Sequence, residues 1–157
     1  MKGKSLLVLS LTFLGALSCT EENIPKPFVY SKVFTGDISK TWKVKFLEVT
    51  TKGQVDDTFT LPCDADHQYT FYANAERAFK VTAGANKCSD TDADVINDAW
   101  GFNNATATLS MVLPFFTSSS LPFIVREAKK NKMELEIFLD EANTSSYRIH
   151  FEPTQED

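Results

Sequence analysis

The three cysteines are the residues with the most distinctive chemistry in this 157-residue chain: Cys19, Cys63 and Cys88. An apolar stretch, residues 5–17, precedes the first of them and follows a basic start. It is about a dozen residues long, too short to span a bilayer and typical of a secretory signal. The small residues just before Cys19 predict a lipobox, in which the thiol is acylated and the chain is cut before it. We therefore expect a signal peptide over residues 1–18 and a lipid on Cys19; the alternative is a secretory signal with an incidental cysteine.

Cys63 and Cys88 then remain as an even pair in an oxidising compartment, which favours a disulfide between them. Two free buried thiols are the alternative. Cys63 also begins the run Cys63-Asp-Ala-Asp-His67, whose cysteine, acidic and histidine side chains are possible metal ligands. Zinc needs about four ligands in fixed geometry, and a disulfide at Cys63 would remove its thiolate. We therefore predict no metal site in this run.

A second acidic run, Asp90-Thr-Asp-Ala-Asp94, begins with the spacing of a calcium loop. Val95 stands where such a loop has its glycine, and Gly101 stands where it has its bidentate glutamate. We interpret the run as a solvated acidic loop.

Catalysis has little support in the sequence. The two histidines, His67 and His150, have no serine or cysteine nucleophile placed beside them by the sequence. Glu127, Glu134 and Glu136 could pair as acid and base, but the last two alternate with apolar residues and are expected on a wet outer face. We predict no catalytic residue, no cofactor and no enzyme.

The charge of the chain argues against some partners. The net charge is −5, and removal of residues 1–18 takes away Lys2 and Lys4, which leaves 14 basic against 21 acidic residues and a net charge of −7. An acidic body favours neither nucleic acid nor anionic membrane surfaces. We therefore expect membrane attachment through the lipid on Cys19 alone.

The segment after Cys19 is rich in proline and charge, which predicts an extended tether over residues 19–35. Within it, residues 28–34 are apolar enough to pack along the sheet or to plug one end of it. Thr20-Glu21-Glu22 resembles the acidic export tags of lipoproteins that some Gram-negative bacteria move to the outer face of the outer membrane. An outer-membrane, cell-surface location is therefore expected, the alternative being a polar start to a linker.

Residues 36–157 are predicted to form an all-β domain. Residues 42–49 alternate apolar and charged side chains, with Trp42, Val44 and Phe46 expected on the inner face, as a strand with one wet face requires. The same pattern returns in shorter pieces, with a further short strand around Phe59 and Leu61. The expected strands cover residues 42–49, 68–73, 77–82, 99–103, 106–113, 123–127, 133–139 and 146–152. About eight strands joined mostly by short turns favour an antiparallel up-and-down barrel over a sandwich, with the last strand paired to the first.

Aromatic residues fall mostly on the inward positions of these strands. The candidate lumen residues are Trp42, Phe46, Tyr69, Phe71, Phe79, Trp100, Phe102 and Met111. A barrel of this strand number is either filled by such side chains or holds one small ligand, and the sequence leaves both open. Phe115 and Phe116 lie in the predicted loop over residues 114–122. We expect them to form a lid over the barrel mouth, a partner-binding tip or a cap on the core.

The order of several motifs resembles one protein family. A lipobox, Ile38-Ser-Lys-Thr-Trp-Lys-Val44, Cys63 and Tyr-Thr-Phe71 form one half of the pattern. Cys88, Ala99-Trp-Gly-Phe102, Thr106-Ala-Thr-Leu109 and Tyr-Arg-Ile-His-Phe151 form the other half. Over residues 36–152 the chain resembles the lipocalin-like domain of small bacterial surface lipoproteins of the Bacteroidetes type.

The resemblance implies a barrel that binds a small apolar molecule, although many bacterial members have no known ligand. It also implies an arginine lying over the tryptophan of the first strand at the shut end of the barrel. Arg148 would pair in this way with Trp42, and Arg126 is the competing candidate. Lys40-Thr-Trp42 keeps the tryptophan of the lipocalin start motif and lacks its glycine.

The sequence leaves two functions open. The first is a lipid-anchored envelope lipoprotein that binds a small hydrophobic molecule in a barrel. The second is a non-enzymatic surface interaction module with a filled barrel that acts through its loops, on a protein partner that the sequence does not identify.

Overall fold

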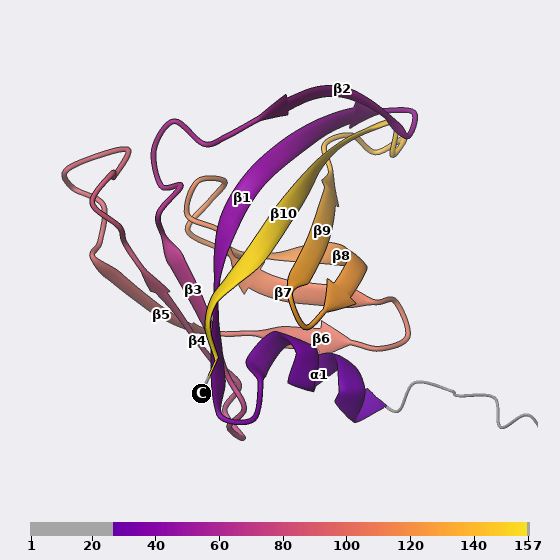
Figure 1. Ribbon diagram of the computed structural model, residues 1–157. Coiled ribbons are helices and arrows are strands. Elements are labelled where there is room, and N and C mark those ends of the chain that lie inside the picture. Colours follow the sequence, from indigo (N-terminus) through magenta and orange to yellow (C-terminus); the bar gives the residue numbers. More distant parts are fainter. Residues whose placement is uncertain (1–26, 157) are drawn as a thin grey trace, which may run out of the picture.

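The computed structural model describes residues 27–156, which form one short helix and a curled antiparallel sheet (Figure 1). The elements are α1 (Pro27–Thr35), β1 (Ser39–Thr51), β2 (Gln54–Phe59), β3 (Gln68–Tyr72), β4 (Ala78–Thr82), β5 (Val95–Ala99), β6 (Gly101–Asn103), β7 (Thr108–Val112), β8 (Ser120–Lys129), β9 (Lys132–Phe138) and β10 (Ser145–Glu156). The predicted all-β fold is confirmed.

The sheet curls into a nearly closed barrel of nine strands in the order β5-β4-β3-β1-β10-β9-β8-β7-β6. Its two edges, β5 and β6, are consecutive in the chain and are separated only by Trp100. β2 lies off this path and pairs with the second half of β1. The predicted pairing of the last strand with the first is confirmed, since Val44 in β1 lies opposite Phe151 in β10.

Several strands are longer than predicted, such as β8, which begins at Ser120 rather than at residue 123, and two further differences change the number of strands. The long polar stretch before Ala99 was expected to contain no strand, but it includes β5, which hydrogen-bonds to β4. The strand expected over residues 99–103 is interrupted at Trp100, where the chain leaves β5 and enters β6. The buried indole of Trp100 forms the corner between these two edges of the sheet.

Helix α1 replaces the described part of the predicted tether. Pro27 stands at its first position, where a missing backbone N–H costs no hydrogen bond. The helix ends at Thr35 and is followed by Gly36, whose positive φ of 63° suits a residue without Cβ and whose N–H donates to the carbonyl of Lys32. Phe34 is fully buried, so of the two arrangements predicted for this segment, along the sheet or as a plug of one end, the structure has the plug. The signal peptide, Cys19 and the acidic export tag lie outside the described residues.

In the part of the chain that the structure describes, no helix combines the length and the apolar character needed to cross a membrane.

Candidate functional site

The predicted lumen residues mostly meet inside the barrel. Seven of them belong to the core or pack against it: Trp42, Tyr69, Phe71, Phe79, Trp100, Phe102 and Met111. The Phe71 ring centroid lies 4.8 Å from that of Phe79 and 6.0 Å from that of Trp100. These rings are in van der Waals contact, so side chains occupy the space where a lumen ligand was expected.

Phe46 is the exception, because it points out of the barrel. A bulge lies between Val44 and Phe46 where β1 pairs with β10, and it reverses the faces of the residues that follow. Leu47 takes the inward position, while Phe46 stacks on His150 of the outer face with ring centroids 4.1 Å apart. The prediction that Phe46 lines the lumen is therefore wrong.

The α1 end of the barrel is closed by side chains from α1 and β1. The Phe34 ring packs edge-on against Trp100 and Phe102, at centroid distances of 6.2 and 5.2 Å. The indole N–H of Trp42 donates to the Phe34 carbonyl over 2.9 Å, and the Lys40 ammonium lies 4.6 Å from the Trp42 ring centroid. A cation therefore covers this tryptophan, but it comes from the same strand.

Arg148 does not reach Trp42, and this expectation from the resemblance is wrong. Arg148 lies opposite Glu48 in the β1–β10 pairing, whereas Trp42 lies opposite Pro153. The Arg148 side chain faces outward, 3.7 Å from carboxylate oxygens of Glu48 and Glu136. Arg126, the competing candidate, is also held outside the barrel by Glu136.

The opposite end of the barrel is covered by the loop between β7 and β8, residues 113–119, which is shorter than the predicted loop because β8 already begins at Ser120. The Phe116 ring packs against Tyr147 of β10 and Phe123 of β8, at centroid distances of 5.4 and 6.4 Å. Phe59 at the end of β2 meets Tyr147 from another side. Of the roles predicted for Phe115 and Phe116, the structure supports a cap on the core, since both are partly buried against it.

No family model matches the chain, and no curated protein is significantly similar to it.

A pocket of about 470 Å³ lies outside the barrel, between α1, the β3–β4 turn and β6. We call it the α1-end pocket. It is lined by Ser31, Lys32, Thr35, Gly36, Asp37, Ala73, Asn74, Arg77, Trp100, Phe102 and Asn104. Two predicted lumen residues, Trp100 and Phe102, thus line a pocket that opens to solvent and lies behind the packed core.

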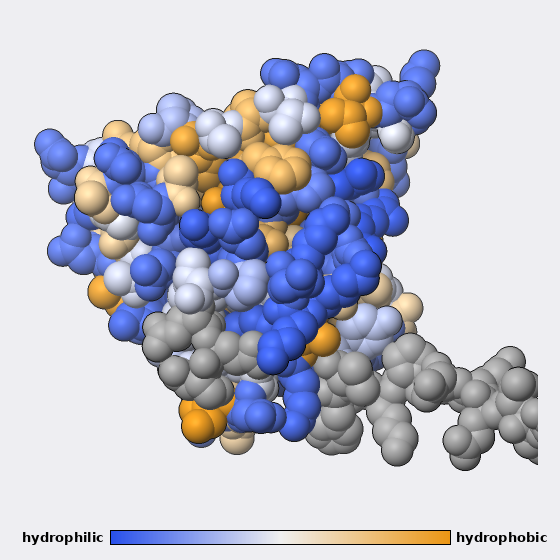
Figure 2. Space-filling view, viewed as in Figure 1, coloured by the Kyte–Doolittle hydropathy of each residue, from blue (hydrophilic) through white to orange (hydrophobic). Residues whose placement is uncertain are grey.

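A wider hollow of about 870 Å³ lies on the outer face of β1, β10, β9 and β8. We call it the outer-face pocket. It contains Phe46 and Val55, and Figure 2 shows apolar atoms gathered in the upper part of the visible face, over β1 and β2. The remaining lining residues are mostly charged: Lys45, Glu48, Glu127, Lys129, Lys132, Glu134, Arg148, His150 and Glu152.

Cross-strand pairs of opposite charge organise this outer face. His150 lies between two carboxylates, with Nε2 at 3.2 Å from Glu48 and Nδ1 at 3.2 Å from Glu134. Its outward position was predicted, but the ring is buried against Phe46. The signal for these pairs was present in the alternation: Glu134 and Glu136 on one strand face His150 and Arg148 on the next.

Glu136 is the most enclosed acid of this network, with only 3% of its surface exposed. Glu136 was predicted on the solvated outer face of the sheet. It does lie on the outer face, but neighbouring side chains cover it. Burial raises the pKa of its carboxyl, but the hydrogen bonds from Ser146 and Arg126 and the charges of Arg126 and Arg148 outweigh burial and hold that pKa below its usual value.

This depressed pKa predicts an acid-sensitive contribution to stability. The contribution is complete above the unfolded-state pKa of about 4.3 and is lost as the pH falls through the folded-state value. The free energy of unfolding of the wild-type protein should therefore fall more steeply than that of Glu136→Gln between about pH 6 and pH 3. Urea unfolding at a series of pH values measures both slopes. Glu141→Gln, at an exposed position, serves as the control, and parallel slopes for Glu136→Gln and wild type would contradict the assignment.

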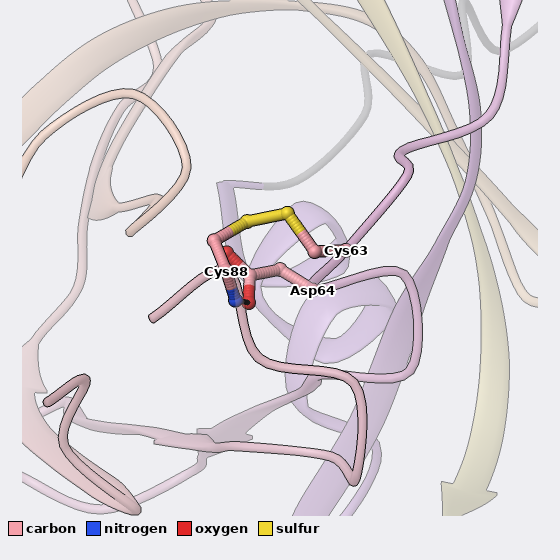
Figure 3. Close-up of side chains that lie close together, drawn as sticks. All are labelled: Cys63, Asp64 and Cys88. Atoms are coloured by element: carbon pink, nitrogen blue, oxygen red, sulfur yellow. Dashed lines mark hydrogen bonds between the residues drawn. A yellow bond between two sulfur atoms is a disulfide. The ribbon is translucent and has the colours of Figure 1, made fainter. Parts of the chain in front are cut away.

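The predicted disulfide between Cys63 and Cys88 is present, with Cα atoms 5.1 Å apart (Figure 3). Among the described residues, Cys63, Asp64 and Cys88 bring three potential metal-ligating atoms together, but the two sulfurs are bonded to each other. The Asp64 carboxylate instead accepts a hydrogen bond from the Cys88 N–H and lies 3.2 Å from His67 Nε2. The arrangement links two loops and offers no thiolate.

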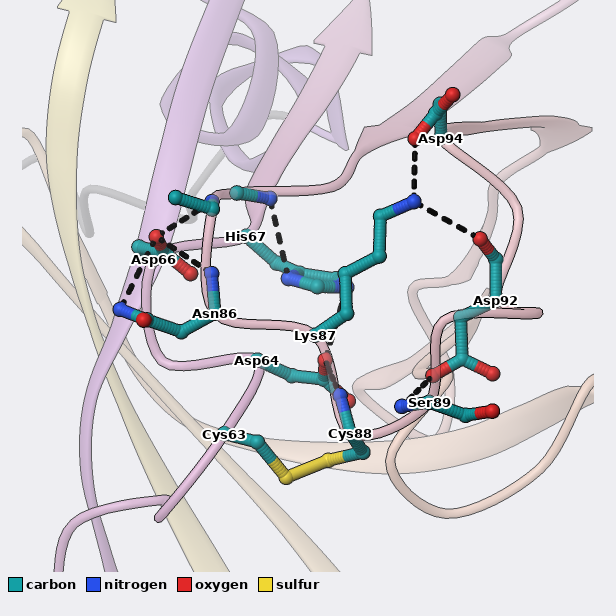
Figure 4. A network of polar contacts seen from close by, with 12 residues as sticks. Cys63, Asp64, Asp66, His67, Asn86, Lys87, Cys88, Ser89, Asp92 and Asp94 are labelled. Atoms are coloured by element: carbon teal, nitrogen blue, oxygen red, sulfur yellow. Dashed lines mark hydrogen bonds and ion pairs between the residues drawn. A yellow bond between two sulfur atoms is a disulfide. The ribbon is translucent and has the colours of Figure 1, made fainter.

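The acidic residues around the disulfide bind backbone and lysine groups (Figure 4). Asp66 accepts hydrogen bonds from the N–H groups of Ala85 and Asn86. Gly84 passes so close to Asp66 that a Cβ at this position would overlap the carboxylate. Lys87 pairs with Asp94 and donates to the Asp92 carbonyl, and its hydrogen bond and charge lower the pKa of Asp94. The acidic runs therefore hold the loops over residues 62–67 and 83–94 in place.

Proposed function

We propose that this protein is a lipid-anchored protein of the bacterial cell envelope whose barrel is filled and which acts, without catalysing a reaction, through its outer surface. The observation that carries the proposal is the packed interior. Trp42, Tyr69 and Phe71 are fully buried in one aromatic cluster, and Phe34 and Phe116 cover the two ends. A lumen ligand would have to displace several of these side chains, each of which stabilises the fold by about 2 kcal/mol or more.

The environments of the two histidines also support a role without catalysis. His67 receives the Gly84 N–H at Nδ1 and lies against Asp64 at Nε2. His150 has a carboxylate at each ring nitrogen and an aromatic ring on one face. Both rings are engaged in contacts that hold loops or strands together.

The lipid anchor is proposed from the sequence before Cys19, and the cell-surface location from the acidic residues that follow it. The acidic body, with a net charge of −7 after removal of residues 1–18, gives no electrostatic attraction to anionic lipid headgroups. Attachment would therefore depend on the acyl chains, while the barrel remains free to meet other molecules.

Mass spectrometry of the full chain, made in a Gram-negative host and extracted with detergent, tests the proposal. We expect an added mass that maps to acyl groups on Cys19, absent from Cys19→Ala, and no apolar molecule that is released only when the protein is denatured. Recovery of one such molecule per chain would overturn the filled barrel. An unmodified Cys19 in the wild-type chain would separately overturn the proposed lipid anchor.

A further inference from the structure

The α1-end pocket has a fixed aromatic floor. Trp100 is only 5% exposed, and its indole N–H donates to the Tyr72 carbonyl over 3.2 Å. Phe102 is held between Phe34 and Tyr30, at centroid distances of 5.2 and 5.6 Å. These contacts fix both rings before any ligand arrives, so little conformational entropy would be lost on binding.

A guanidinium group stands over this floor. The Arg77 guanidinium carbon lies 5.5 Å from the Trp100 ring centroid. No carboxylate among residues 27–156 forms an ion pair with Arg77, whereas Lys32, the other cation of the pocket, is bound to Asp37 at 3.0 Å. The pocket therefore carries one net positive charge, at Arg77.

Backbone hydrogen bonds hold the turn that carries Arg77. The backbone N–H of Arg77 donates to the Asn74 carbonyl, and the Arg77 carbonyl accepts from the backbone N–H of Trp100 over 2.9 Å. Arg77 has a φ of 51°, a left-handed conformation that costs a residue other than glycine about 1 kcal/mol. The turn thus holds a long cationic side chain at a position where glycine would be the less strained choice.

We propose that the α1-end pocket binds a small organic carboxylate with an apolar body. The body would lie against Phe102 and the small part of Trp100 that lines the pocket, and the carboxylate would pair with the Arg77 guanidinium, whose planar fork matches two carboxylate oxygens. A volume of about 470 Å³ lies within the range of small-molecule sites. This site goes beyond the proposed function, since it depends neither on the anchor at Cys19 nor on the outer-face pocket.

The lining of the pocket separates this class of ligand from others. A cationic ligand would be repelled by Arg77, and a neutral apolar one would leave the guanidinium over the ring without an anion. A free phosphate would gain nothing from the aromatic floor, because it has no apolar surface to place there. Arg77, Trp100 and Phe102 together match a molecule that has both an anionic end and an apolar body.

The carboxylate has two possible sources, a planar aromatic acid in solution or a fatty acid released from a membrane. Titration of the full chain with 2-naphthoate and with decanoate, followed by the NMR signal of the Trp100 indole N–H, distinguishes them. We expect saturable binding of at least one acid and binding at least about tenfold weaker for the matching neutral amide. Preference for naphthoate would identify the planar class, and preference for decanoate the aliphatic class.

Two variants assign the anionic end of the ligand. Arg77→Gln should weaken binding of the preferred acid at least about tenfold. Lys52→Gln removes the same charge beyond the far end of β1 and should change binding less than about twofold. Equal binding of acid and amide by the wild-type chain, or no saturable binding of either acid, would overturn the proposal even if Arg77→Gln folded poorly.

Discussion

Replacing Trp42 with alanine is expected to lower the free energy of unfolding by about 3 to 5 kcal/mol, the range for truncating a buried aromatic residue. Trp42 has 0% of its surface exposed and lies opposite Tyr69 in β3 and Pro153 in β10. Truncation would leave a cavity among these strands and would remove the partner of the Phe34 carbonyl. Because small domains are stable by only about 5 to 15 kcal/mol, this loss should remove a large fraction of the total stability. Urea unfolding followed by far-ultraviolet circular dichroism measures the loss.

Two further variants separate the sources of this loss. Trp42→Phe keeps most of the ring and removes the hydrogen bond to Phe34, so its loss should be smaller than that of the alanine variant. Ile38→Ala truncates a side chain that is 69% exposed just before β1 and should change stability by less than about 0.5 kcal/mol. A loss below about 1 kcal/mol for Trp42→Ala would contradict the packing described for the α1 end of the barrel.

The alternation of apolar and polar residues predicted most of the sheet correctly, because a two-residue period identifies the inner face of each strand. It could not locate the bulge in β1. Phe46 and Leu47 are adjacent and both apolar, so either could be the inward residue, and only the pairing of Phe46 with His150 decides between them. Helix α1 was not predicted because its nine residues are too few to show a clear helical period, and its burial depends on the end of a barrel formed by distant strands.

The candidate site was harder to predict than the fold. The aromatic residues indicated the core, but whether a barrel is filled depends on side-chain packing at both ends, which residue types alone do not determine. Lys40 lies at an inward position in the alternation, yet a charged residue there was not expected to cover Trp42. The sequence did not indicate that Arg77 lines a pocket. A turn places its guanidinium over Trp100, which follows it by 23 residues in the chain. Only the three-dimensional structure brings these groups together.

Removal of the disulfide is expected to have the second large effect on stability. Cys63 and Cys88 are separated by 25 residues, and closing a loop of this length stabilises a domain by roughly 3 to 4 kcal/mol in the chain-entropy model. The double variant Cys63→Ser/Cys88→Ser should therefore lose about this much free energy of unfolding. Asp64 and Asp66 accept hydrogen bonds from the N–H groups of Cys88 and Ala85, and these bonds link the two loops without the covalent bond. We therefore expect the variant to fold. Urea unfolding of the variant and of the oxidised wild-type chain gives the difference.

Reduction provides the matched control for this experiment. A thiol reductant should lower the stability of the wild-type chain toward that of the double variant and leave the double variant unchanged, because the variant has no bond to break. Alkylation of the full chain under denaturing conditions without reductant should leave Cys63 and Cys88 unlabelled. If both react, the protein carries two free thiols and the stability of the loops depends on Asp64 and Asp66 alone. Since β3 begins directly after the first of these loops and β5 directly after the second, loss of the covalent link should release the edge of the barrel at β5 before the central strands β1 and β10 separate.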